Sequence, residues 1–274
     1  MTNIAPSDTH RPGLVTAALL GLSRHTPFGR GQMRKLMAKG VRALNDGPLD
    51  VPLYGGTARL HLSNNNSEIK ALLSPRRFAR EEYQFCAQHM PSHDGVFFDI
   101  GGNAGIFSLY VASLMQSGTL IIAEPQPAMF KRLSTNFSVM NPAIAARLNL
   151  HLHQTALGAE DGRLTLSIPE SAGQASARPV EGVPTIDVPV TPMLTLLTQA
   201  NATKLDLLKI DVEGFEDGIL FPFFETAPAS LHPKAIVMEC CHAGRWQRDC
   251  EALLLGHGYQ IAHKDRTNMM LEKA

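Results

Sequence analysis

The sequence lacks an excess of charge of either sign. Its 274 residues include 25 Lys or Arg and 25 Asp or Glu, so the formal net charge is zero. A protein that attracts nucleic acid by its overall charge carries a basic excess. An Asn-Pro-Pro-Tyr-type motif is also missing. We therefore expect no nucleic-acid partner, although the balance leaves room for a local basic patch.

Cysteine is scarce as well. Four thiols occur, with neither the spacing of a zinc site nor the density of a disulfide scaffold: Cys86, Cys240, Cys241 and Cys250. Reduced thiols in a cytosolic protein are the simplest interpretation. We expect the adjacent pair, Cys240 and Cys241, to be buried as small apolar groups rather than to act as nucleophiles.

Apolar runs long enough to cross a bilayer are also missing. Residues 14–22 are apolar but too few for a transmembrane helix. Asp8 precedes this run and no clear small-x-small cleavage site follows it, which argues against a signal peptide. We therefore expect a cytoplasmic protein without a transmembrane segment.

From residue 96 onward, continuous apolar strands alternate with amphipathic helices. Such strands are buried on both faces, so the pattern predicts an α/β fold with a doubly wound, mostly parallel sheet. The last two strands follow each other without a helix, which predicts an antiparallel hairpin at the C-terminal edge. The expected strands are 96–100, 119–123, 148–154, 164–168, 205–210, 235–239, 259–263 and 269–272, and the expected helices are 106–115, 128–140, 193–199 and about 245–255.

Residues 1–75 lack this alternation and are expected to form an N-terminal extension to a main domain at 76–274. The polar start, residues 1–12, is expected to be disordered. Residues 50–62 predict a β-hairpin that turns at two glycines. A small-residue loop at 171–184 is expected to be mobile and, with the extension, to determine the substrate.

An amphipathic helix is predicted over residues 30–45. Apolar residues recur there at helical spacing, at Met33, Leu36, Met37, Val41 and Leu44. We expect this stripe to pack on the domain and the basic residues to form a solvated face. Weak peripheral contact with a membrane surface, or contact with a phosphate, is the alternative.

The most informative stretch follows the first strand of the main domain. Asp99 ends that strand, and Gly101-Gly102-Asn103-Ala104-Gly105 turns the chain into a helix. In doubly wound sheets, ligands bind beyond the carboxyl ends of the strands, and glycines let the backbone approach them closely. A carboxylate here would repel a pyrophosphate, and the spacing is not Gly-x-Gly-x-x-Gly. Both points disfavour an NAD-type oxidoreductase, the rival enzyme class.

The next two strands end in polar or small residues as well. Glu124 follows the second strand and Pro125 halts it, so the acid can accept hydrogen bonds from both hydroxyls of a ribose. Thr155 and Ala156 follow the third strand, where folds of this type line an adenine pocket with small and apolar residues. These residues predict a nucleoside site.

Charged residues crowd together at 209–216, where the strand 205–210 ends. Strand alternation places Lys209, Asp211 and Glu213 on one side, and clustered acids perturb each other's pKa values. An ion-paired helix N-terminus is an alternative, and both interpretations can hold together.

The following strand ends in Glu239, with His242 close behind. An imidazole ionises near neutral pH and can serve as a general base, although a lone histidine is more often structural. Glu239 is the better candidate for contact with a substrate or a metal.

Together, these motifs resemble the FkbM family of S-adenosylmethionine-dependent methyltransferases. The resemblance is carried by residues 98–105, 123–125, 154–158 and, most specifically, 208–216, and it extends from Gly55 to the last residue. It implies a class I, Rossmann-like methyltransferase fold, which the C-terminal hairpin distinguishes from a plain dinucleotide-binding domain. It also implies O-methylation of a small-molecule or glycan hydroxyl on a sugar, polyketide or other secondary metabolite.

The resemblance also implies roles for the site residues. Asp99, Gly101 and Gly105 would bind the methionine end of the cofactor, and Glu124 would hold its ribose. The remaining residues expected at the cofactor are Gly102, Asn103, Pro125, Thr155, Ala156 and Asp211.

For catalysis, Asp211 is our first choice to orient or deprotonate the acceptor hydroxyl, with Glu213, Glu239 and His242 behind it. If Asp211, Glu213 and Glu239 converge, they could bind a divalent cation, which we do not favour. A methyltransferase-like domain that binds without catalysing is the non-enzymatic alternative.

Overall fold

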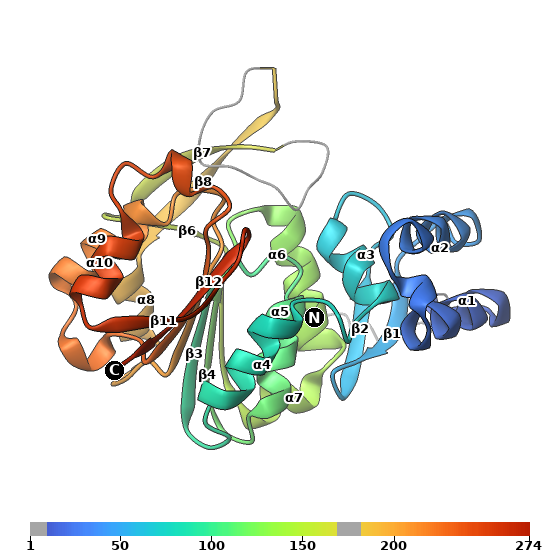
Figure 1. Cartoon of the computed structure of the whole chain (residues 1–274), viewed down its shortest axis with the longest axis horizontal. Coiled ribbons are helices and arrows are strands. Elements are labelled where there is room, and N and C mark those ends of the chain that lie inside the picture. Colours follow the sequence, from blue (N-terminus) through green and yellow to red (C-terminus); the bar gives the residue numbers. More distant parts are fainter. Residues whose placement is uncertain (1–9, 169–181) are drawn as a thin grey trace.

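The computed structural model describes residues 10–168 and 182–274. The predictions for residues 1–9 and for most of the loop 171–184 lie outside these ranges. The main layer is a seven-stranded sheet with the strand order β11-β12-β10-β9-β3-β4-β5 (Figure 1). Its strands are β3 (Gly95–Ile100), β4 (Gly118–Ala123), β5 (Asn149–His153), β9 (Leu207–Ile210), β10 (Ala235–Glu239), β11 (Tyr259–Lys264) and β12 (Asn268–Lys273).

The strand order confirms the doubly wound, mostly parallel sheet. From the central strand β3 the chain builds outward through β4 and β5, then returns to β9 and β10 on the other side, all in parallel. The change of direction between β3 and β9 creates the switch point where such sheets bind ligands. The C-terminal hairpin is also confirmed. Its strand β12 is antiparallel to both β10 and β11, so the outermost strand, β11, runs with the rest of the sheet.

Both faces of the sheet are covered, as the continuous apolar strands predict. Successive residues of β3 point to opposite sides: Phe97 packs in one apolar cluster and Phe98 in another, and both are fully buried. The first cluster includes residues of α4 (Arg80–His89) and α5 (Ile106–Leu114). The second includes residues of α8 (Met193–Gln199), α9 (Asp217–Thr226) and α10 (Cys250–Gly256).

A second, three-stranded sheet lies beside the carboxyl ends of the main strands (Figure 1). The predicted strand at 164–168 exists as β7 (Gly162–Ser167), but it joins this sheet rather than the main one. It pairs antiparallel with β8 (Thr185–Pro192), which pairs in parallel with β6 (Ala156–Gly158). The sequence pattern does not indicate β6 or β8, because β6 is very short and the prolines and polar residues of β8 break any apolar run.

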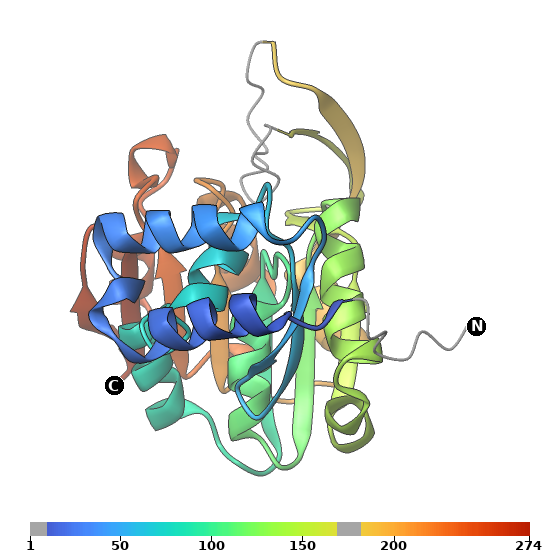
Figure 2. The ribbon, with the colours of Figure 1, turned by 90° about the vertical axis from the view of Figure 1, so that its right-hand side faces the viewer.

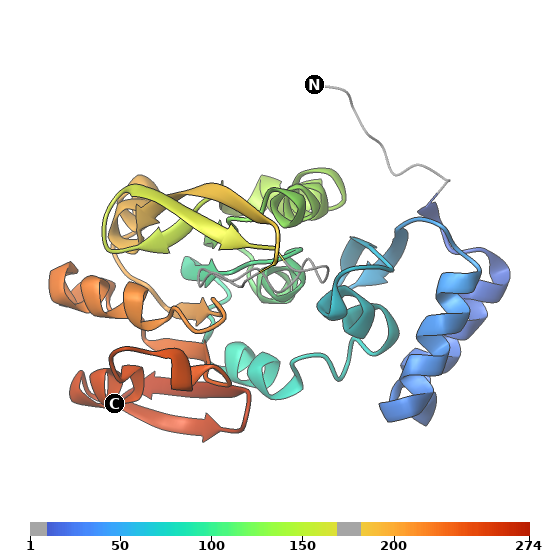
Figure 3. The ribbon, with the colours of Figure 1, turned by 90° about the horizontal axis from the view of Figure 1, so that it is seen from above.

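The N-terminal extension contributes two hairpins (Figures 2 and 3). Helices α1 (Leu14–His25) and α2 (Gly31–Ala43) pack side by side, and β1 (Leu49–Leu53) pairs with β2 (Gly56–Leu60) as predicted. Seen from above in Figure 3, β1, β2 and α3 (Asn66–Leu73) lie between the two helices and the main sheet. Within the described ranges, no helix combines the length and the apolarity needed to cross a membrane.

The helix predicted at 30–45 is confirmed, but its apolar stripe does not all pack on the domain. Val41 is buried, whereas Leu36 is 55% exposed and Leu44 is 51% exposed. The side facing the domain runs through Ala38 and Val41, and Leu36 lies roughly 140° around the helix from Val41. Regular spacing therefore predicted the helix correctly and its buried face only in part.

Two asparagines tie the β-hairpin to the main domain. The predicted helix 128–140 is α6 (Pro127–Ser134), continued by a π-helical turn (Thr135–Val139) that carries Asn136. The Asn136 amide donates to the Ala104 carbonyl over 2.9 Å and accepts from the Arg59 backbone N–H over 2.8 Å. The Asn141 amide accepts from the Thr57 backbone N–H and donates to the Thr57 carbonyl. The extension is thus hydrogen-bonded to the turn that follows β3.

We expect Asn136→Ala to lower the free energy of unfolding by about 2 kcal/mol, because it leaves the half-buried Arg59 N–H and the buried Ala104 carbonyl without their Asn136 partner. Urea denaturation measures this change. Asn149→Ala removes an exposed asparagine and is the control. Equal stability of the two variants would contradict the role given to Asn136.

Candidate functional site

A cavity of about 630 Å³ lies at the carboxyl ends of β3, β4, β9 and β10. Its size is in the usual range for small-molecule sites. The residues after β3 and β4, the start of β6, and the segment from Lys209 to Glu213 form much of its wall. The N-terminal extension closes another side with Arg34 and Lys70, and Arg77 lines this side from just beyond the extension; the sequence pattern indicates none of the three.

The glycine turn after β3 packs directly against the end of β9. Gly101 has a φ of +81°, and a Cβ there would lie 2.0 Å from the carbonyl oxygen of Asp211. A Cβ on Gly102 would lie 2.3 Å from the Ile122 side chain. Only glycine fits at these positions, so the backbone of the turn forms the cavity wall.

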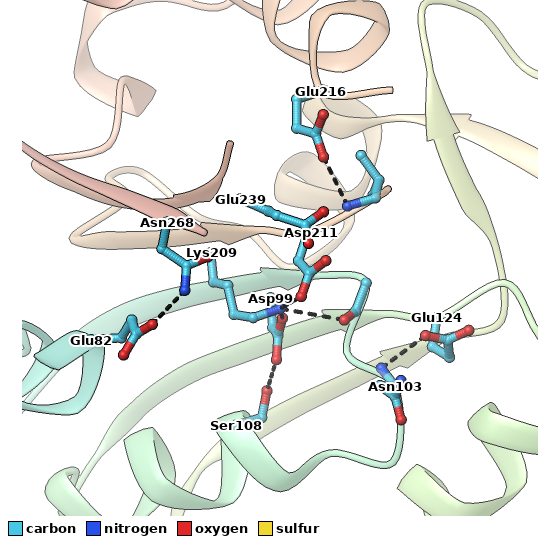
Figure 4. Close-up of polar contacts among 12 residues, drawn as sticks. Glu82, Asp99, Asn103, Ser108, Glu124, Lys209, Asp211, Glu216, Glu239 and Asn268 are labelled. Carbon is cyan, nitrogen blue, oxygen red and sulfur yellow. Dashed lines mark hydrogen bonds and ion pairs between the residues drawn. The ribbon is translucent and has the colours of Figure 1, made fainter. Parts of the chain in front are cut away.

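Asp99 lies beneath this turn and is fully buried. The parallel register sets it opposite Lys209, whose Nζ lies 3.1 Å from Asp99 Oδ1 (Figure 4). The Ser108 hydroxyl donates to the other carboxylate oxygen over 2.5 Å. Both oxygens of Asp99 are thus bonded within the protein, and Asp99 is not among the cavity-lining residues in the described chain. The predicted contact of Asp99 with a cofactor has no support in this arrangement.

Lys209, the cationic partner of Asp99, lines the cavity wall. Its Nζ also lies 3.7 Å from Asp211 Oδ2 and 3.4 Å from the Gly101 carbonyl oxygen. Burial alone would lower the pKa of Lys209, but the carboxylates of Asp99 and Asp211 outweigh it and raise the pKa above its usual value. Lys209 therefore stays charged and links β3, β9 and the glycine turn.

Glu124 faces the same cavity from the end of β4 and is only 6% exposed. One carboxylate oxygen accepts from the Asn103 N–H (Figure 4) and the other from the Gln126 N–H, both over 2.8 Å. Burial raises the pKa of Glu124 to about 7 despite these bonds. A carboxylate has about four lone-pair sites, so Glu124 can still accept hydrogen bonds from a ligand.

Most of the predicted cofactor residues come together at the cavity. Gly105 is an exception, because it packs against Phe137 at the start of α5. Asp99 is the other exception. The predicted residues that line the cavity are Gly101, Gly102, Asn103, Glu124, Pro125, Thr155, Ala156 and Asp211.

Three of the four predicted catalytic residues converge at the cavity wall. Asp211, Glu213 and Glu239 each offer a carboxylate oxygen, and these oxygens lie within 4.8 Å of one another. Burial, followed by the charges of Glu239 and Asp211, raises the pKa of Glu213 to about 7. Burial and the nearby Asp211 also raise the pKa of Glu239. Burial and crowding of this kind favour the protonated forms of Glu213 and Glu239, and hard oxygen donors are also the ligands of divalent cations.

His242 stands behind this cluster. Its Nδ1 lies 3.3 Å from Glu239 Oε2 and 3.4 Å from Glu213 Oε2, and its side chain is 29% exposed. It therefore touches the two acids and the solvent, whereas the cavity wall in the described residues does not include it.

The prediction that Cys240 and Cys241 are both buried is wrong. Cys240 is half-buried and Cys241 is exposed at the turn after β10, because the chain leaves the sheet at this point. The Cys241 thiol donates to Glu239 over 3.1 Å. Desolvation and the charge of Glu239 raise the pKa of Cys241 to about 12, so a nucleophilic thiolate is disfavoured.

Comparison with known proteins gives a family match. A family model described as the methyltransferase FkbM domain matches residues 99–261. Methyltransferase 1 of Beauveria bassiana (strain ARSEF 2860) is 28% identical over 148 residues, which are 46% of this chain and 57% of that protein. The chain thus matches little more than half the length of this relative.

Solved structures are more distant. The precorrin-6y C5,15-methyltransferase of Geobacter metallireducens GS-15 shares 14% identity and a TM-score of 0.42, over 71% of this chain and 88% of that one. An O-methyltransferase of Bacillus cereus in complex with SAH shares 11% identity and a TM-score of 0.43, over 71% and 81%. These scores are low, so the fold assignment rests on the strand order.

We expect Asp99→Asn to lower the free energy of unfolding by about 3 kcal/mol, because it leaves the buried Lys209 ammonium with the more distant Asp211 alone. Asp211→Asn, at a side chain that is 43% exposed, is the control and should cost less than about 1 kcal/mol. Chemical denaturation at neutral pH measures both. If Asp99→Asn is the milder change, the ion pair does not have the structural role described here.

Proposed function

The chain belongs to the FkbM methyltransferase family, and on that premise we propose that it binds S-adenosylmethionine in this cavity and methylates a hydroxyl oxygen. The acceptor we propose is a sugar, glycan or other secondary metabolite. The observation that carries the proposal is that buried Glu124 and the carboxylates of Asp211, Glu213 and Glu239 share one cavity, which a glycine turn lines. The family membership favours this function over an NAD-type oxidoreductase.

The residues of the cavity fit such a cofactor. The ribose diol would donate to Glu124, which is fixed by two backbone N–H groups and retains free lone pairs. The glycine turn leaves the space that a side chain would fill and exposes backbone groups to the methionine end. Acidic side chains in the wall favour a cationic ligand over a pyrophosphate.

When bound, the cofactor supplies an electrophilic methyl group on a sulfonium. The protein must then align the acceptor oxygen and remove its proton. Asp211 is placed to orient the hydroxyl, because it sits beside the glycine turn and pairs with Lys209. Glu213, with a pKa of about 7, accepts the proton, and His242 can pass it from the acid pair toward solvent.

We expect Glu124→Ala to weaken S-adenosylmethionine binding roughly a hundredfold, because two hydrogen bonds from the ribose to a charged group are lost. Isothermal titration calorimetry measures the affinity. Glu160→Ala, which removes the same charge from an exposed position, is the control. Thermal melting verifies that Glu124→Ala folds, and Glu124→Asp keeps the charge on a shorter arm. Unchanged affinity in the folded Glu124→Ala protein would refute the ribose role.

The pH dependence of turnover tests which residue accepts the proton. Because Glu213 must be ionised to accept a proton, kcat should rise with pH about tenfold per unit below pH 7 and level off above it. Glu213→Gln should lower kcat by roughly 10²–10⁴-fold and abolish this rise. Glu225→Gln, at an exposed acid, is the control. Measurement requires a turnover assay with an accepted hydroxyl compound.

Two outcomes would change the mechanism. An unchanged pH profile in Glu213→Gln would remove Glu213 as the base. Loss of activity after dialysis against EDTA, with recovery on adding Mg²⁺, would indicate that a cation held by the three acids activates the hydroxyl in place of Glu213. Tight cofactor binding without turnover on a broad panel of hydroxyl acceptors would instead favour the non-enzymatic alternative.

A further inference from the structure

Exposed apolar side chains gather on the N-terminal helical hairpin. Seven of the nine exposed large apolar residues in the described part of the chain lie between residues 14 and 44. Leu14 is 92% exposed and Val15 is 64% exposed, values far from those of a packed helix face. The seven residues are Leu14, Val15, Leu22, Phe28, Met33, Leu36 and Leu44. Such concentration on one element marks an interaction surface.

Three of these residues lie along the contact between the two helices. Gly40 of α2 lies against Leu19 of α1, which fixes the line of contact between the helices. Val15 and Leu22 are one turn from Leu19, and Leu36 is one turn from Gly40, so all three lie along this line. The side toward the domain is taken by other residues, Thr16, Leu20 and Ser23 on α1 and Ala38 and Val41 on α2. We call the apolar side the outer face, made of Leu14, Val15, Leu22, Met33 and Leu36.

Charge is segregated in the same segment. Residues 10–45 contain seven Lys or Arg (Arg11, Arg24, Arg30, Arg34, Lys35, Lys39 and Arg42) and no Asp or Glu, although the whole chain is balanced. Arg24 and Arg42 bond to backbone carbonyls of the extension. Arg30, Lys35 and Lys39 are exposed. The outer face is therefore apolar and flanked by basic side chains.

We propose that the outer face docks on an anionic lipid surface. An exposed apolar stripe flanked by Lys and Arg, without acids, combines the two attractions that hold a helix in the headgroup region. A second copy of the chain would bring like charges together, and a nucleic acid would leave the apolar residues unused. Figures 2 and 3 show both helices on the outside of the molecule, with β1, β2 and α3 behind them.

Docking there leaves the cavity on the other side of α2, because Arg34 and Leu36 point roughly 200° apart on the helix. Arg34 belongs to the same helix as Leu36 and lines the cavity. The inference goes beyond the proposed methyl transfer and does not depend on it, because lipid binding is measured without turnover.

Flotation of the full chain with vesicles tests this proposal. We expect binding to vesicles of phosphatidylcholine with phosphatidylglycerol, little binding to phosphatidylcholine alone, and weaker binding at high salt. Leu36→Asp should weaken binding at least tenfold. The double change Lys35→Glu and Lys39→Glu should weaken it roughly thirtyfold or more. Leu255→Asp, at a residue of α10 that is 46% exposed, is the matched control and should bind like the parent protein.

Several results would overturn the proposal. One is equal binding by Leu36→Asp and Leu255→Asp, with circular dichroism melts showing both folded. Another is a parent dimer in size-exclusion chromatography that Leu36→Asp converts to a monomer, which would identify a second copy as the occupant. A third is release of the chain from anionic vesicles by RNA together with unchanged vesicle binding of Leu36→Asp, which would identify a nucleic-acid surface.

Discussion

The buried ion pair between Asp99 and Lys209 is the interaction on which the site depends. It joins β3 and β9 at the switch point of the sheet, and both residues are at most 9% exposed. Asp99 compensates the charge of Lys209, and Lys209 in turn reaches the Gly101 carbonyl and Asp211. A neutral pair of apolar residues could hold the strands together, but it could not place a cation between the glycine turn and the acidic cluster.

The same arrangement keeps Lys209 charged next to acids whose pKa values are raised. Glu124, Glu213 and Glu239 have raised pKa values because they are buried and, on the cluster side, because they repel one another. Lys209 lines the same cavity, and its positive charge offsets part of this effect at Glu124. The cavity therefore combines a cation with two acids, Glu124 and Glu213, whose pKa values are raised to about 7, which suits proton transfer.

Much of this organisation could be predicted from the sequence. Apolar strands with acids at their ends predicted the sheet, and parallel strands bring those ends to one edge, so Glu124, Asp211 and Glu239 were found. The burial of Asp99 could not be predicted, because spacing does not say whether a carboxylate faces a ligand or a lysine on the neighbouring strand. Likewise, the apolar stripe that includes Leu36 predicted the helix but not which of its sides is buried. The small sheet was missed because its pairing depends on tertiary contacts rather than on a local pattern.

The contact between Gly101 and the Asp211 carbonyl also limits how the proposed site can be engineered. No Cβ fits between them, so the proposed cofactor cradle and Asp211 pack together as one unit. A substitution that shifts Asp211 to suit a new acceptor would displace the cradle as well. Arg34 and Lys70 line the same cavity from the N-terminal extension and Arg77 from just beyond it, all outside the segments that form this unit. Directed evolution of acceptor choice should therefore begin with these three residues and leave the sheet edge unchanged.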